Sequence, residues 1–125
     1  MTPIQVLLVE DDPAWQAAVE TLLDSEAGIT LAAVADHYNE AMAAYDRLHP
    51  DVVLLDWQIC GERDGLMLGE ALLRERQFPA ERMILVTGSD SSLLPPHAFK
   101  LVPKSRIAHD LIYAIHEASA TPAKR

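Results

Sequence analysis

Short apolar runs alternate along the chain with longer segments whose apolar residues recur at helical intervals. Three runs are continuous and rich in β-branched side chains: residues 6–9, 52–55 and 83–86. Continuous apolar runs of this length are typical of strands covered on both faces. Ile29–Ala35 and residues 99–103 are weaker strand candidates. The proline that ends the last one donates no ladder hydrogen bond, so this strand either stops there or lies at an edge of the sheet.

Helical periodicity fills the segments between the predicted strands. Apolar side chains recur every three or four residues in four segments: 13–27, 38–48, 66–77 and 107–115. Asp12 and Pro13 are typical of the N-cap and the first position of a helix. Strands that alternate with helices predict an α/β domain in which a parallel sheet is covered by helices on both faces.

The segment between the last two predicted strands is the least regular. Residues 89–98 contain Ser91, Ser92, Pro95 and Pro96, and two consecutive prolines leave room for at most one helical turn before them. We therefore expect a shortened or missing helix there. Because the chain shows no internal repeat and no linker, residues 1–120 are predicted to form one domain and residues 121–125 a frayed tail.

Length, composition and charge mainly exclude classes of protein. A chain of 125 residues, half of them hydrophobic, is long enough for one domain with a substantial core. No apolar run approaches the roughly 20 residues that cross a bilayer, and acidic residues follow the start too closely for a signal peptide. The lone Cys60 cannot form an internal disulfide. The net charge of −9 argues against nucleic-acid binding through the overall field. We expect a cytoplasmic domain.

Polar residues follow the predicted strands where the strands end. In order along the chain they are Glu10, Asp11, Asp56, Thr87 and Lys104. Because the carboxyl ends of parallel strands open on one edge of a sheet, we expect these side chains to gather there. Carboxylates so placed repel one another unless a cation lies among them, and oxygen ligands of this kind suit Mg²⁺. With a hydroxyl and an ammonium group added, the set indicates phosphoryl transfer onto Asp56.

Four segments together resemble the signature segments of the response-regulator receiver domain of two-component signalling. They read VLLVEDDP, PDVVLLDWQICGERDGL, ILVTGS and LVPKS. They occur in the family's order and on the expected elements, and the resemblance covers nearly the whole chain. It implies a flavodoxin-like, doubly wound sheet of five parallel strands in the order 2-1-3-4-5, here with a shortened or missing fourth helix.

The resemblance also implies a role for individual residues in phosphorylation. Asp56 corresponds to the phosphoacceptor, Thr87 to the residue that hydrogen-bonds a phosphoryl oxygen, and Lys104 to the residue that pairs with another. Gly88 would leave room for the phosphoryl group. By themselves, a strand-end threonine and a lysine are ordinary surface residues, and strand-end carboxylates are often helix caps. The interpretation therefore depends on the whole set.

The same resemblance implies a Mg²⁺ site. Asp11 and Asp56 would bind the ion directly, and Glu10 would act through water. The backbone carbonyl of Gln58 would be a further ligand, which leaves the Gln58 side chain free to influence how long the phosphoryl group lasts.

A receiver of this kind would take its phosphoryl group from the phosphohistidine of a histidine kinase or a phosphotransfer protein. It would then switch a protein-interaction surface for an output protein or domain, or relay the group further. Its own catalysis would be limited to self-phosphorylation and dephosphorylation, and it would bind neither nucleic acid nor membrane. The main alternative is a non-phosphorylated interaction module with the same fold. A flavin or nucleotide binder is a second alternative, but the glycine-rich loop it needs after the first strand is absent.

The chain departs from the family pattern between Thr87 and Lys104. The segment is several residues shorter than usual, and Leu101 occupies a switch position that is usually aromatic. Both changes leave the phosphorylation chemistry intact and predict an altered switching surface. Elsewhere, the histidines show no metal-ligand spacing and are expected to be surface or partly packed residues. Tyr113 is assigned to the core together with the apolar stripe of residues 107–115.

Overall fold

The structure is a computed structural model that describes residues 2–56, 65–88 and 99–120. Its centre is a five-stranded parallel sheet in the order β2-β1-β3-β4-β5. The strands are β1 (Ile4–Val9), β2 (Ile29–Ala35), β3 (Val52–Asp56), β4 (Met83–Thr87) and β5 (Lys100–Pro103). The predicted strand order is confirmed.

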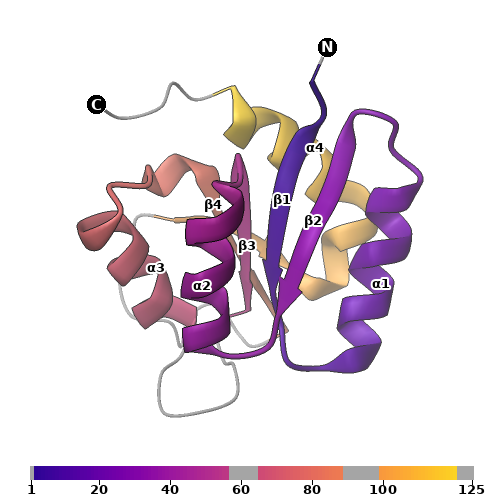
Figure 1. The fold of residues 1–125 in the computed structure, drawn as a ribbon. Helices are drawn as coiled ribbons and strands as arrows, with labels where there is room; N and C mark the ends of the chain where they lie inside the picture. Colours follow the sequence, from indigo (N-terminus) through magenta and orange to yellow (C-terminus); the bar gives the residue numbers. More distant parts are fainter. Residues whose placement is uncertain (1, 57–64, 89–98, 121–125) are drawn as a thin grey trace.

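Four α-helices of the described residues cover the sheet (Figure 1). They are α1 (Pro13–Asp24), α2 (Tyr38–Leu48), α3 (Gly65–Glu75) and α4 (Ile107–Ser119), and two short 3₁₀ helices are η1 (Ala80–Arg82) and η3 (Lys104–Arg106). The predicted flavodoxin-like class is confirmed, and four helices fit a shortened or missing helix between β4 and β5. Residues 89–98, where that helix was expected, and the predicted tail at 121–125 lie outside the described residues.

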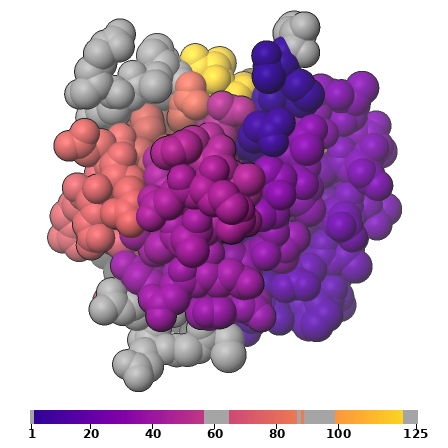
Figure 2. All heavy atoms as spheres, in the orientation of Figure 1, coloured from indigo at the N-terminus to yellow at the C-terminus, as the bar shows by residue number. Residues whose placement is uncertain are grey.

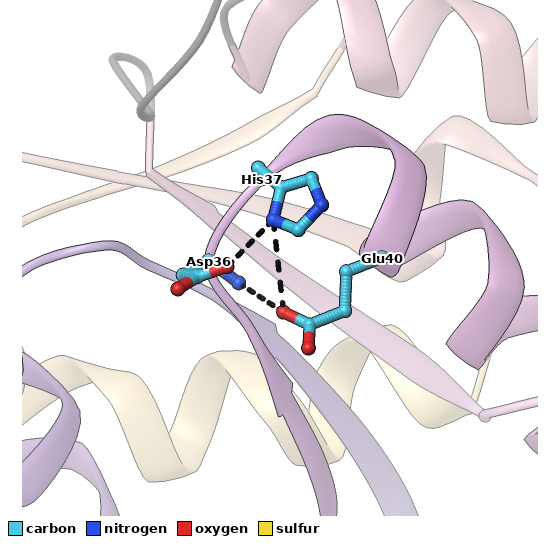
Figure 3. A group of neighbouring side chains, drawn as sticks. All are labelled: Asp36, His37 and Glu40. Carbon is cyan, nitrogen blue, oxygen red and sulfur yellow. Dashed lines mark hydrogen bonds and ion pairs between the residues drawn. The ribbon is translucent and has the colours of Figure 1, made fainter.

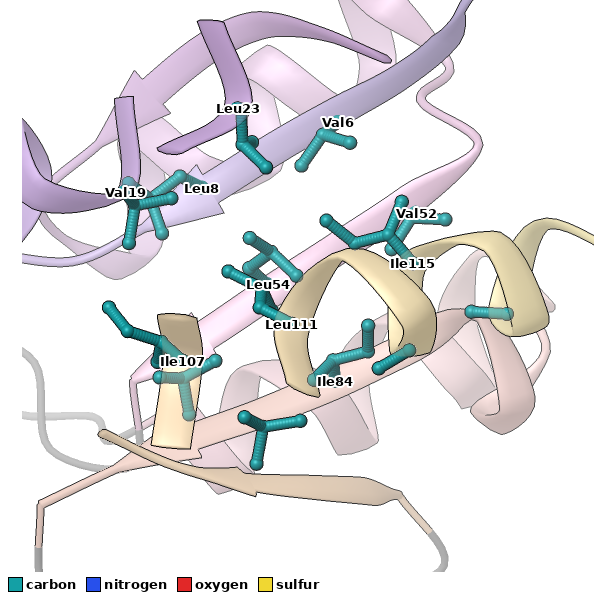
Figure 4. Packing of buried hydrophobic residues seen from close by; sticks show 14 of the residues in the cluster. Val6, Leu8, Val19, Leu23, Val52, Leu54, Ile84, Ile107, Leu111 and Ile115 are labelled. Carbon is teal, nitrogen blue, oxygen red and sulfur yellow. The ribbon is translucent and has the colours of Figure 1, made fainter. Parts of the chain in front are cut away.

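The two faces of the sheet carry separate apolar cores because side chains alternate along each strand. One core packs against α1 and α4 and is seen in Figure 4; its strand residues include Val6, Leu54 and Ile84. The other packs against α2 and α3 and includes Leu7 and Leu55. Figure 2 shows α2 and α3 forming much of the surface on that side. Full burial of one such aliphatic side chain contributes about 1.5–3 kcal/mol, so the sheet is held firmly from both sides.

The start of α1 follows the prediction closely. The Asp12 carboxylate accepts a hydrogen bond from the Ala14 backbone N–H at 2.9 Å, and Pro13 occupies the first helical position. A capped start of this kind fixes where the helix leaves the carboxyl end of β1. The helix ends at Asp24, short of the predicted residue 27.

The edge strand β2 contains an irregularity in its pairing with β1. Val6 pairs with Leu31, whereas the next residue, Leu7, pairs with Ala33. Ala32 is therefore an extra residue on β2, which is the pattern of a β-bulge.

One core assignment is wrong. Tyr113 has 71% of its surface exposed, whereas Leu111 and Ile115 on the same helix are fully buried. Tyr113 lies two residues beyond Leu111, and two residues correspond to about 200° around a helix, which places it on the opposite side.

None of the described helices is both long and apolar enough to span a bilayer.

Candidate functional site

Five strand-end residues reach the same edge of the sheet, at the lower side of Figure 1. Glu10 and Asp11 follow β1, Asp56 ends β3, Thr87 ends β4 and Lys104 follows β5. Glu10, Asp11 and Asp56 each offer a carboxylate oxygen, and these oxygens lie within 4.8 Å of one another. The topology thus brings together three carboxylates that are separated by up to 46 positions in the chain.

Lys104 lies against this carboxylate group. Its Nζ is 3.0 Å from Glu10 Oε1 and 3.8 Å from Asp56 Oδ1. The side chain of Lys104 is only 11% exposed, and those of Glu10 and Asp56 are 4% and 12% exposed. Buried charges need partners, so removing Lys104 would leave two carboxylates away from water without a compensating cation.

Glu10 is fixed by its backbone as well as by Lys104. Its N–H donates to the Ala35 carbonyl at 2.9 Å, and its carbonyl accepts from the Gln16 side-chain amide at 2.6 Å. Glu10 Oε2 also accepts from the Asp12 backbone N–H at 3.1 Å. These contacts tie the end of β1 to β2 and to the first turns of α1.

Asp56 is electrostatically unusual. Burial, and then the neighbouring Glu10 carboxylate, raise its pKa from 3.8 to about 7 against the opposing effect of Lys104. A carboxyl group perturbed both by burial and by a like charge is a candidate functional group. A cation bound beside Asp56 would favour its ionised form.

The donor set fits a hard cation. The three side chains supply only oxygen atoms, and such ligands are preferred by Mg²⁺, which keeps part of its water shell and binds phosphate oxygens. Asp11 is exposed, whereas Glu10 and Asp56 are buried. The group is therefore open to solvent on the Asp11 side.

The remaining predicted site residues are only partly described. Thr87 pairs with Pro103 in the sheet register, which places its backbone at the same edge. Gly88 follows, and a methyl group added there would lie 3.5 Å from Lys104 Cδ. Gln58 and Cys60 lie outside the described residues.

Trp15 is a neighbour of the site that the sequence analysis did not identify. Its helical spacing assigned it only to the apolar stripe of α1, and the structure does pack it, partly buried, against the core under α1 and α4. Its ring also lies 4.8 Å from Lys104 Nζ, measured to the ring centroid. The available signal was its position in the first helical turn, directly after the strand-end carboxylates.

A second group that offers metal-ligand atoms lies at the start of α2. Asp36, His37 and Glu40 are exposed and close together (Figure 3). His37 Nδ1 is 2.7 Å from Asp36 Oδ1, and Glu40 Oε1 accepts from the Asp36 backbone N–H at 2.9 Å. The hydrogen bond with His37 lowers the pKa of Asp36 below its ordinary value. These contacts stabilise the start of α2, and His37 is at the surface, as expected.

Comparison with known proteins gives a family match over most of the chain. The family model of the response regulator receiver domain matches residues 6–114. The chain is 33% identical over 91 residues to the protein-glutamate methylesterase/protein-glutamine glutaminase of Agrobacterium fabrum, covering 71% of this chain and 26% of the relative. It is 35% identical over 91 residues to the nitrate/nitrite response regulator protein NarP of Escherichia coli, covering 73% and 41%. It therefore spans less than half the length of these two relatives.

Solved structures give the same result for the fold. The signal receiver domain of the putative response regulator NarL from Mycobacterium tuberculosis superposes with a TM-score of 0.82 at 21% identity, over 98% of this chain and all of that one. The response regulator domain of Thermotoga maritima CheB superposes with a TM-score of 0.77 at 18% identity, over 96% of this chain and 98% of that one. The PhyR receiver domain of Erythrobacter litoralis superposes with a TM-score of 0.76 at 26% identity, over all of this chain and 98% of that one.

Proposed function

Because the chain belongs to the response regulator receiver domain family, we propose that it accepts a phosphoryl group on Asp56 in a Mg²⁺-dependent reaction. The donor is the phosphohistidine of a cytoplasmic histidine kinase or phosphotransfer protein. Phosphorylation then changes the surface offered to an output protein or domain, or the group is relayed further. The domain itself contacts neither nucleic acid nor membrane.

The observation that supports this proposal most strongly is the burial of Asp56 beside Lys104 and two further carboxylates. Asp56 Oδ1 and Lys104 Nζ are 3.8 Å apart, and both side chains are largely withdrawn from water. When Asp56 attacks, an oxygen–phosphorus bond forms and the nitrogen–phosphorus bond of the donor breaks. The Lys104 ammonium would stabilise the negative charge that the phosphoryl oxygens bring into this low-dielectric site.

Asp11 and Asp56 would bind the Mg²⁺ ion directly and Glu10 would act through water, with the backbone carbonyl of Gln58 as a further ligand. The bound ion would supply charge neutralisation for the incoming phosphoryl oxygens. Without an added cation, burial and the repulsion from Glu10 oppose the ionisation of Asp56. The ionised carboxylate is the form that acts as nucleophile. Thr87 would contribute a hydroxyl group to a phosphoryl oxygen, and Gly88 would leave space for it.

The proposal is tested by intact mass measurement after incubation with acetyl phosphate and Mg²⁺. The wild-type protein should gain the mass of one phosphoryl group, and hydroxylamine should remove it, as expected for an acyl phosphate. The Asp56→Asn variant and a wild-type sample with chelator should gain none. If the wild-type protein gains no mass under these conditions, the domain acts instead as a non-phosphorylated interaction module.

A further inference from the structure

The Lys104 ammonium is held in a nearly dry position beside an aromatic ring. The side chain is 11% exposed, its Nζ is 3.0 Å from Glu10 Oε1, and the Trp15 ring centroid lies 4.8 Å away. An ammonium within about 6 Å of an indole face is attracted by the ring quadrupole, and the attraction grows when the pair is desolvated. With Asp56 Oδ1 at 3.8 Å, Lys104 therefore has two charged partners and one neutral partner.

The local sequence explains how Trp15 reaches Lys104. Asp12 caps α1 and Pro13 is its first residue, so Trp15 lies in the first helical turn. Side chains of a helix point back toward its N-terminus, and here that direction leads to the carboxyl edge of the sheet. Packing against the core beneath α1 and α4 restrains the ring.

A neutral partner has a property that a carboxylate lacks. A carboxylate neutralises the charge of an ammonium and accepts hydrogen bonds from it. It therefore competes with a phosphoryl oxygen for the positive charge and for the N–H donors of the lysine. The face of an indole attracts the cation without bearing a full negative charge. The partners also differ in availability, because a bound cation would engage Glu10 and Asp56 but not Trp15.

We infer that Trp15 is a positioning residue that keeps the Lys104 ammonium at the phosphorylation site when the carboxylates are engaged elsewhere. This inference rests on the proposed function, in which Lys104 meets a phosphoryl oxygen. Trp15 acts through Lys104 alone and contacts neither the cation nor the phosphoryl group.

The first test compares the rate of phosphorylation by acetyl phosphate in two variants. Trp15→Leu keeps an apolar side chain but removes the aromatic face, and its rate should fall about tenfold, the size expected for loss of a desolvated cation–π contact. Trp15→Phe keeps an aromatic face and should retain most of the rate, and Mg²⁺ affinity should be unchanged in both. A wild-type rate for Trp15→Leu, or equal losses in the two variants, would overturn the inference.

The second test is a double-mutant cycle on stability with Trp15→Leu and Lys104→Met, measured by urea unfolding. If the two side chains interact, Trp15→Leu should lower the folding equilibrium constant about tenfold more in the wild-type background than in Lys104→Met. Additive effects would show that Trp15 only packs, which refutes the role proposed here. The proposed function fails separately, if wild-type protein forms no adduct with acetyl phosphate.

Discussion

Removing the charge of Asp56 should stabilise the metal-free protein at and above neutral pH. Burial, and then the charge of Glu10, raise the pKa of Asp56 from 3.8 to about 7 in the folded protein. Over the interval between these two values the folded protein retains a proton that the unfolded chain has already released. Asparagine has a similar shape and does not titrate, so Asp56→Asn removes this difference between the two states.

The direction and size of the effect follow from proton linkage. Because the folded-state pKa is the higher one, the stabilising contribution is complete below about pH 4 and is lost as the pH rises through about 7. The loss is about 1.4 kcal/mol for each pH unit in that window, or on the order of 4 kcal/mol in all. This is a large part of the roughly 5–15 kcal/mol that stabilises a typical domain. Wild type and Asp56→Asn should therefore be similarly stable near pH 4, and the variant should be more stable near pH 8.

The assay is urea unfolding of both proteins, with a chelator present, at a series of pH values between about 4 and 8. Asp12→Asn is a matched control because Asp12 is exposed, lies next to the site and can be replaced by asparagine without losing the helix cap. It should keep the wild-type pH profile. Mg²⁺ should stabilise wild type by binding the folded state, and so narrow its difference from Asp56→Asn at high pH.

Parallel stability profiles for wild type and Asp56→Asn in chelator would refute this reasoning. That result would mean that Asp56 ionises in the folded protein at nearly the same pH as in the unfolded chain. Lys104 would then offset both the burial of Asp56 and the repulsion from Glu10 completely.

Three further predictions concern a helix cap, the core and the lifetime of the phosphorylated form. Asp12→Ala should lower the free energy of unfolding by about 1 kcal/mol, because it removes the hydrogen bond to the Ala14 N–H; a loss equal to that in Asp12→Asn would contradict this. Leu54→Ala should lower it by about 2–5 kcal/mol, because Leu54 is fully buried on the central strand, whereas Leu22→Ala, at a partly buried position on α1, should cost less in the same urea assay. Gln58→Ala should change the half-life of the aspartyl phosphate without changing Mg²⁺ affinity, and equal half-lives would exclude a role for the Gln58 side chain.

The sheet could be predicted because its central strands are buried on both faces and therefore consist of consecutive apolar residues. The first strand was nonetheless predicted too short. Ile4 and Gln5 belong to β1 because they pair with Ile29 and Thr30 on β2. This pairing depends on β2, which is distant in the sequence. The polar Gln5 also interrupts the apolar run, so a local hydrophobic pattern does not include the first two residues of β1.

The end of α2 at Leu48 was predicted correctly and the end of α3 at Glu75 was not, although neither end carries the usual glycine signal. His49 after α2 and Gln77 after α3 both adopt left-handed backbone conformations, with φ of 48° and 56°. Glycine is the usual residue there because it has no Cβ. The Phe78 N–H donates to the Leu72 carbonyl at 3.1 Å, so backbone hydrogen bonding closes the end of α3. The residue types at this end do not indicate where the helix stops.

Strand-end positions were sufficient to predict that the carboxylates and Lys104 meet at one edge of the sheet. They did not predict that Lys104 lies closer to Glu10 than to Asp56. They also gave no indication of Trp15, whose spacing is that of an ordinary core residue. Which neighbour a long side chain contacts depends on rotamers chosen by packing, and that information appears only once the elements are placed.

The bulge in β2 and the proline that ends β5 have a consequence for the behaviour of the protein at high concentration. Both strands lie at the margins of the sheet, where unpaired backbone groups are a template for strand addition and aggregation. Ala32 interrupts the regular spacing of β2, and Pro103 removes a donor from a strand of only four residues. Each margin therefore carries its own obstacle to edge-to-edge association.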